Sequence, residues 1–187
     1  YIKRPVEPLD REYYQTVYAN SEGSVAAPPA GLHFTAGLLA ELARRSVVIA
    51  PLTLHVGQAT FKPVSSEDIR SHRMGEETYT IPAATAAAVA AARAAGSQVC
   101  AVGTTSCRTL ESCAATGALE GSTGLYIYPG YSFRCVTMLL TNFHLPKTTL
   151  FVLVCAFAGT ELARRAYAQA VEERYRFYSY GDAMLIV

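Results

Sequence analysis

The rest of the chain is expected to be organised around TNFHLPKTT at residues 141–149 and LFVLVCAFAG, which follows it at residues 150–159. The first part carries an amide, an imidazole, an ammonium group and three hydroxyls, whereas the only polar-capable side chain of the second is the Cys155 thiol. Pro146 disfavours a helical Leu145, so we predict a helix that begins after it, with Thr148 or Thr149 as the N-cap. Such a helix is apolar on every face and is therefore expected to be buried.

A polar segment at the start of a buried helix is a good position for a catalytic or binding site, because the segment is held rigidly and the helix amides favour anions. The same composition is also typical of a polar turn between a strand and a core helix. The local sequence leaves both interpretations open.

Composition sets the limits of the fold. The 187 residues, 51% hydrophobic and 17% charged, allow one sizeable core or two small ones. The apolar run 150–158 is too short to span a membrane, and no signal peptide opens the chain. The chain begins with Tyr1 and not Met, which suggests a fragment.

Net charge bears on whether the protein binds nucleic acids, and the cysteines bear on the redox state of its compartment. The net charge of +1 indicates no general nucleic-acid affinity, and the arginine pairs 44–45 and 164–165 fit exposed helix ends as well as a polyanion contact. The five cysteines are odd in number and form no CxxC pair, which favours reduced thiols and a cytoplasmic location.

The order of elements predicts an α/β fold with layers around one sheet. Residues 1–24 are predicted to be an extended lead-in to an α/β domain at 25–187, in which 60–64 are also extended. Helices are predicted at 36–45 after a Thr35 cap, from Pro82 to 95 before Gly96, after Gly103, and from a Thr160 cap to about 175. Strands are predicted at 47–56, 98–102, 125–128 and 183–187, with an apolar piece at 135–140.

Polar residues gather in stiffened loops. The sequence GTTS at 103–106 follows a buried strand and opens a helix, which places hydroxyls and free amides where α/β sheets bind ligands. No histidine or cysteine pair has the spacing of a structural zinc site, and neither GxSxG, GxGxxG nor a P-loop occurs. The residues alone therefore predict a loop-built site for a polar small molecule or a nucleoside.

The same loops resemble one family over nearly the whole chain. The motifs, in order, are VYA and GSVAAPPAGLHFT at 17–35, TLHVGQATFKPV at 53–64, AVGTTSCRTLES at 101–112, IYPGYSF at 127–133, LLTNFHLPKTTL and LVCAFAG at 139–159, and YRFYSYGDAMLI at 175–186. They are similar to those of the S-adenosylmethionine:tRNA ribosyltransferase-isomerases of queuosine biosynthesis. The chain resembles the carboxyl-terminal half of these proteins, so most of their inserted β-barrel domain would be absent.

The resemblance implies a tRNA-modifying enzyme that uses S-adenosylmethionine as ribosyl donor and needs no metal. The ribosyl group would pass to 7-aminomethyl-7-deazaguanine at the wobble position of tRNA, giving epoxyqueuosine, adenine and methionine. A monomer without membrane contact is expected. The alternative is a truncated, inactive module that binds a nucleoside or tRNA. The chain departs from the family pattern at Pro29, Ala59, Gly75 and Thr137, and Gly75 replaces a histidine.

The implied chemistry requires removal of a proton next to the sulfonium, a neutral amine, and protonation of the departing adenine. The loop-borne groups suited to these steps are His144, His33, Glu77 and Asp182. The residues expected to bind substrate are Thr104, Thr105, Arg108, Asn142, Tyr14, Gln15, Tyr131 and Tyr180. Structural alternatives exist for each of these side chains: bridging a loop, capping a helix, or packing in the core.

Overall fold

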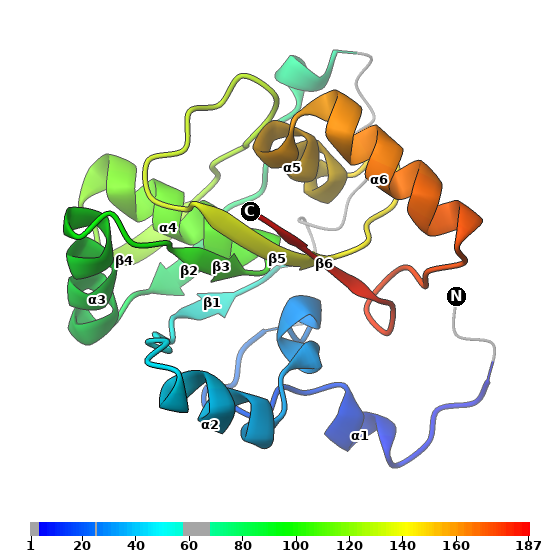
Figure 1. The fold of residues 1–187 in the computed structure, drawn as a ribbon, viewed down its shortest axis with the longest axis horizontal. Coiled ribbons are helices and arrows are strands. Elements are labelled where there is room, and N and C mark those ends of the chain that lie inside the picture. The colour runs from blue at the N-terminus through cyan, green and yellow to red at the C-terminus, as the bar shows by residue number, and fades with distance from the viewer. Residues whose placement is uncertain (1–3, 25, 58–67) are drawn as a thin grey trace.

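The computed structural model describes residues 4–24, 26–57 and 68–187 and confirms the α/β class. The predicted single sheet is wrong, because the strands of these residues form two sheets of three strands each (Figure 1). Of the sequence-based expectations, the extended segment 60–64 and the family departure at Ala59 lie outside the described residues. Within the segment predicted as an extended lead-in, α1 (Asp10–Tyr13) is helical.

The first sheet positions two polar turns of the sequence, at 103–106 and 141–147, at one edge. Its order is β3 (Cys100–Val102), β5 (Met138–Asn142) and β6 (Ala183–Ile186). Strands β3 and β5 run parallel with Val102 opposite Leu140, whereas β6 is antiparallel to β5. The carboxyl ends of β3 and β5 therefore lie side by side.

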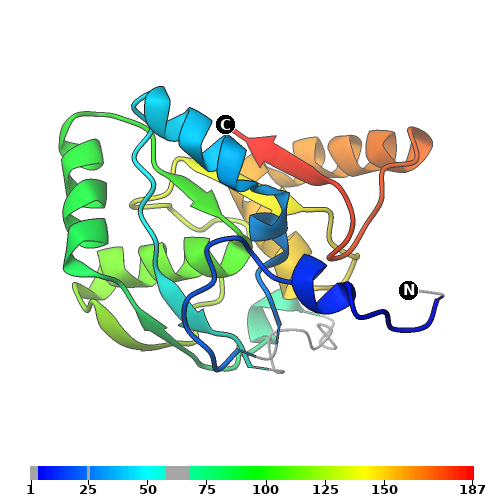
Figure 2. The same ribbon diagram turned by 90° about the horizontal axis from the view of Figure 1, so that it is seen from below.

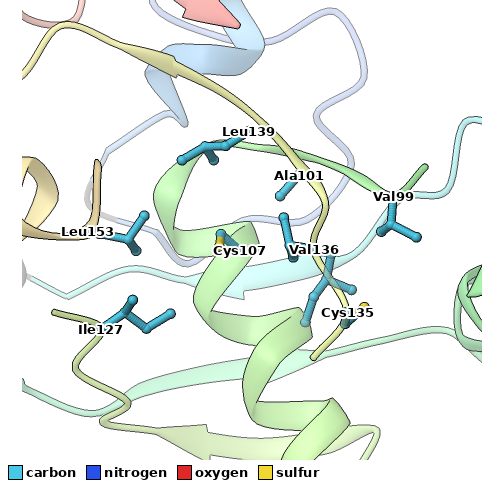
Figure 3. Packing of buried hydrophobic residues seen from close by; sticks show 9 residues of the cluster. Val99, Ala101, Cys107, Ile127, Cys135, Val136, Leu139 and Leu153 are labelled. Carbon is cyan, nitrogen blue, oxygen red and sulfur yellow. The ribbon is translucent and has the colours of Figure 1, made fainter. Parts of the chain in front are cut away.

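Helices α4 (Thr104–Thr116) and α5 (Thr149–Ala158) enclose the main core with this sheet. Leu139 of β5, Cys107 of α4 and Leu153 of α5 are at most 2% exposed and point into one cluster (Figure 3). Ile127 reaches the same cluster from the loop before β5. A second cluster joins α5 to α6 (Thr160–Glu172) through Val154 and other residues. The prediction that the apolar segment after Pro146 is a buried helix is confirmed.

The second sheet is antiparallel, in the order β1 (Thr53–His55), β2 (Glu77–Thr80) and β4 (Glu120–Thr123). Two strand predictions fail here. Only 53–55 of the predicted strand 47–56 pairs, since Pro51 lacks an amide N–H and 47–50 are exposed. The segment 125–128 is unpaired, and the strand lies at Glu120–Thr123 instead.

The helix predictions hold closely because their signals are local. Thr35 accepts a hydrogen bond from the Leu38 amide at the start of α2 (Ala36–Arg44). Pro82 precedes α3 (Ala83–Ala94), and Gly96 follows it with φ +65°. The Thr160 cap is wrong: Gly159, with φ +85°, holds the N-cap position of α6. Two 3-10 helices, η1 (Pro29–His33) and η3 (Ile69–Ser71), complete the described elements.

Candidate functional site

The candidate site lies at the carboxyl ends of β3 and β5, the edge at which ligands bind in open α/β sheets. Strand β3 leads into Gly103 and α4, and β5 leads into Phe143 and His144. The Gly103 amide donates a hydrogen bond of 2.8 Å to the carbonyl of Leu140, which fixes the two strand ends together. Helix η1 packs against this edge, since a Cβ on Gly103 would lie 3.8 Å from the Cβ of Ala30.

The start of α4 supplies donors at this edge. Gly103 has φ +93°, a backbone conformation that glycine adopts without strain and that turns the chain sharply into the helix. Thr104 is buried and Thr105 is half-buried directly after this turn. The first amides of a helix have no intrahelical acceptor and carry the positive end of its dipole. This turn can therefore hold a carboxylate or phosphate, as the sequence predicts for Thr104 and Thr105.

His144 follows β5 and is held from two sides. Its Nε2 forms a 2.7 Å hydrogen bond with the Thr141 hydroxyl, and its amide donates a 3.0 Å hydrogen bond to the Tyr167 hydroxyl on α6. Burial lowers the pKa of His144 from 6.5 to about 4. The imidazole is therefore neutral at pH 7 and is oriented by Thr141, a contact that sequence reasoning missed although the two residues stand three apart.

Asn142 holds the loop at 178–182 in place. This buried side chain donates from Nδ2 to the carbonyls of Tyr178 at 3.0 Å and Gly181 at 3.4 Å. Tyr178 has φ +70°, an uncommon and costly conformation for a non-glycine residue, and the contact with Asn142 helps to hold it. The Asn142 Oδ1 atom is buried without a hydrogen-bond partner in the part of the chain that the structure describes. The predicted substrate-binding role of Asn142 thus coexists with a structural one.

Asp182 ends this loop and is paired with Arg176. The Arg176 side chain donates from Nη2 to Oδ1 at 2.8 Å, and its amide donates to Oδ2 at 2.7 Å. These bonds lower the pKa of Asp182, and the charge of His33 at the end of η1 contributes in the same direction. Asp182 is therefore ionised at neutral pH, and His33, which is exposed, lies within electrostatic range of it. Sequence reasoning did not identify Arg176 as the partner of Asp182.

Two further predicted residues, Tyr14 and Tyr180, meet beside the same loop. Their ring centroids are 5.6 Å apart, and the Tyr14 hydroxyl lies 3.4 Å from that of Ser179. Gln15 is exposed, and its side-chain carbonyl accepts from the adjacent Thr16 amide. Figure 2 shows α1 lying beside the turn that leads into β6. The segment before η1 is therefore packed onto the edge that carries the candidate site.

Glu77 and Arg108 are not brought to this edge. They form a buried ion pair with 2.6 Å between Glu77 Oε2 and Arg108 Nη1, and Arg108 also donates from Nε to the Leu125 carbonyl at 2.8 Å. The expectation that Glu77 is loop-borne is wrong, because it begins β2. The carboxylate that Arg108 holds is that of Glu77, since a buried guanidinium requires a counter-charge. The two side chains tie the second sheet to α4.

Tyr131 also lies elsewhere, in the loop before β5. Its hydroxyl donates to Glu111 Oε2 at 3.2 Å, and its ring packs on Phe133. No three histidine, cysteine, aspartate or glutamate side chains of the described residues lie together as a metal site would require. Within residues 4–24, 26–57 and 68–187, every helix is too short or too polar to cross a membrane.

Comparison with known proteins identifies the family. The family model described as "Queuosine biosynthesis protein" matches residues 1–186. The chain belongs to this family. Relatives named "S-adenosylmethionine:tRNA ribosyltransferase-isomerase" from Geobacter sulfurreducens and Aromatoleum aromaticum are 56% and 59% identical to it over 190 and 189 residues. Each match covers 100% of this chain and 55% of the relative, so the chain spans about half the length of these family members.

A solved family structure supports the fold. The crystal structure of S-adenosylmethionine tRNA ribosyltransferase from Thermotoga maritima is 42% identical to this chain, with a TM-score of 0.72. The match covers 84% of this chain and 51% of that one.

Proposed function

We propose that this chain is part of a cytoplasmic enzyme that transfers and isomerises the ribosyl group of S-adenosylmethionine onto 7-aminomethyl-7-deazaguanine in tRNA, with epoxyqueuosine, adenine and methionine as products. This proposal is supported by the position of His144, Asp182 and the start of α4 at adjoining strand ends, with His33 in electrostatic range of Asp182, in a chain belonging to a queuosine biosynthesis family. The names of the relatives supply the reaction.

The start of α4 is proposed to bind the methionine carboxylate. Free helix amides favour an anion, and the hydroxyls of Thr104 and Thr105 add donors beside them. Tyr14 and Tyr180 are proposed to contact the nucleoside, since aromatic rings beside a polar site stack on bases. Asn142 is proposed to act mainly by holding the loop that carries Asp182.

The two histidines are proposed to divide the proton chemistry. A group whose pKa is about 4 is a weak base at pH 7, so His144 serves to accept or donate a hydrogen bond in a fixed orientation. His33 is exposed and near the Asp182 carboxylate, an arrangement that suits it to remove the proton next to the sulfonium. The reaction needs no metal ion in this scheme.

The test uses the protein at the full length that its gene encodes, incubated with S-adenosylmethionine and with tRNA that carries the aminomethyl base. Adenine release, followed by chromatography in the presence of a chelator, is the expected result. If well-folded protein releases no adenine although calorimetry shows that it binds S-adenosylmethionine, the proposed enzymatic activity is wrong. The alternative, a nucleoside-binding module, would then remain. His33→Ala should lower the rate more than Thr141→Val does, and the reverse order would contradict the assignment of the base.

A further inference from the structure

A hollow of about 570 Å³ lies away from the candidate site, in the loop between β4 and β5. It is lined by residues 126 and 128–134, among them four aromatic rings. Figure 1 shows this loop at the upper edge of the molecule, whereas α1 lies at the lower edge. The volume lies within the range of small-ligand pockets. Nothing in the proposed transfer chemistry uses this hollow.

The rings form two pairs. Tyr126 and Tyr128 have centroids 5.4 Å apart, and Tyr131 and Phe133 have centroids 5.1 Å apart in an edge-on arrangement. Phe133 is in turn supported by Phe157 of α5, at 4.8 Å. Aromatic side chains that line an open hollow offer faces and edges on which a flat base can stack.

One buried carboxylate holds this loop in shape. Glu111 is 0% exposed, and its two oxygens accept hydrogen bonds from the amides of Arg134, Cys135 and Val136 at 2.7 to 2.9 Å. Its Oε2 also accepts from the Tyr131 hydroxyl. The hollow is therefore built before any ligand arrives, which lowers the entropy cost of binding.

A second, smaller hollow of about 250 Å³ adjoins the first and shares Phe133 and Arg134 with it. Arg93 and Gln98 also line it. Neither Arg93 nor Arg134 forms an ion pair with another described residue. The nearby Glu111 carboxylate already accepts hydrogen bonds from the backbone amides of the loop. Guanidinium groups without a counter-charge beside aromatic rings match a nucleotide, whose base is flat and whose phosphate is anionic.

We propose that these two hollows form a second RNA-contact surface, which takes an unpaired nucleotide outside the reacting position. The base stacks among Tyr128, Tyr131 and Phe133, and the adjoining phosphate lies against Arg93 and Arg134. Unpaired nucleotides of folded RNA are the class of ligand that combines these features. That the RNA is tRNA rests on the proposed function, whereas the surface itself rests on the rings and the arginines.

The test compares tRNA binding by the full-length protein and three variants over a series of salt concentrations, by fluorescence anisotropy. Arg93→Gln combined with Arg134→Gln removes both phosphate contacts. Arg164→Gln combined with Arg165→Gln, on the exposed face of α6, removes the same charge elsewhere and is the matched control. Tyr128→Leu keeps the apolar bulk and removes the ring. Unfolding midpoints establish that each variant is folded, and calorimetry gives its affinity for S-adenosylmethionine.

The first double variant is expected to weaken tRNA binding about tenfold and to lower the slope of log K against log salt by between about one and two. Tyr128→Leu is expected to weaken it about five- to tenfold with an unchanged slope. S-adenosylmethionine affinity should not change in either. Equal losses in the control pair, or wild-type tRNA affinity in Tyr128→Leu, would overturn the proposal. Failure of the proposed function would instead appear as a lack of adenine release, which this binding assay does not require.

Discussion

The burial of His144 predicts how the stability of the protein depends on pH. Its pKa is about 4 in the folded state and 6.5 as an ordinary histidine, so below pH 6.5 the unfolded chain binds a proton that the folded chain does not. The free energy of unfolding therefore falls as the pH drops from 6.5 toward 4, and above 6.5 this contribution is fully present. At about 1.36 kcal/mol for each pH unit, the loss has an upper value of about 3 kcal/mol.

The assay is denaturant unfolding of the wild type and of His144→Asn between pH 7.5 and 4.5. Asparagine keeps a hydrogen-bonding group for Thr141 but does not titrate, so the variant should lose most of the pH dependence. Asp10 and Asp182, whose pKa values neighbouring arginines hold below 3.8, lose their contributions only at lower pH, outside this window. His33→Asn, which removes an exposed imidazole, is the control and should keep the wild-type slope. An equal slope in His144→Asn and the wild type would refute the burial argument.

Three further predictions concern turnover and stability. His144→Ala should lower adenine release by about 10²–10³, the loss typical of removing one fixed hydrogen-bonding group, with a small change in unfolding midpoint. Leu153→Ala, at a side chain that is 2% exposed, should cost about 2–5 kcal/mol with normal turnover of the folded fraction. Glu77→Gln should destabilise by about 3–5 kcal/mol because the charge of Arg108 stays buried, and adding Arg108→Met should recover part of this in the same unfolding assay. Gly181→Ala should cost at least about 1–3 kcal/mol by thermal unfolding, since the new Cβ would lie 2.4 Å from the Arg176 carbonyl oxygen; an unchanged midpoint would contradict that geometry.

Local signals in the sequence account for the helices. Thr35 and Thr148 each cap a helix by accepting the amide three residues on, and Pro82 and Gly96 bound α3. These signals act between neighbours in the chain, so they can be read without knowing the fold. The strand prediction at 125–128 failed because a strand also needs a partner strand, and β2 pairs with Glu120–Thr123 instead.

The residues of the candidate site could likewise be predicted only where the signal lies between neighbours in the chain. The helix start at Thr104 was predictable, because a glycine-containing turn after a buried strand places it at the sheet edge. Glu77 and Arg108 form an ion pair although they lie 31 positions apart in the chain. The sequence shows that each side chain is charged, but not that the two side chains meet. The Tyr167 hydroxyl that holds His144 comes from a helix whose sequence shows nothing but amphipathic spacing.

In the proposed transfer, the burial that makes His144 a rigid hydrogen-bonding group leaves the removal of a proton to another histidine. Removing a proton next to a sulfonium requires a group that is unprotonated and basic at neutral pH, and the low pKa of His144 meets only the first condition. A cationic substrate at the edge would lower that pKa further, because a positive charge disfavours a second one nearby. His33 is exposed and lies close enough to Asp182 to contribute to the lowered pKa of that carboxyl. The packing of η1 and the loop at 178–182 against the end of β5 thus places the fixed, neutral imidazole of His144 and the exposed imidazole of His33 at the same sheet edge.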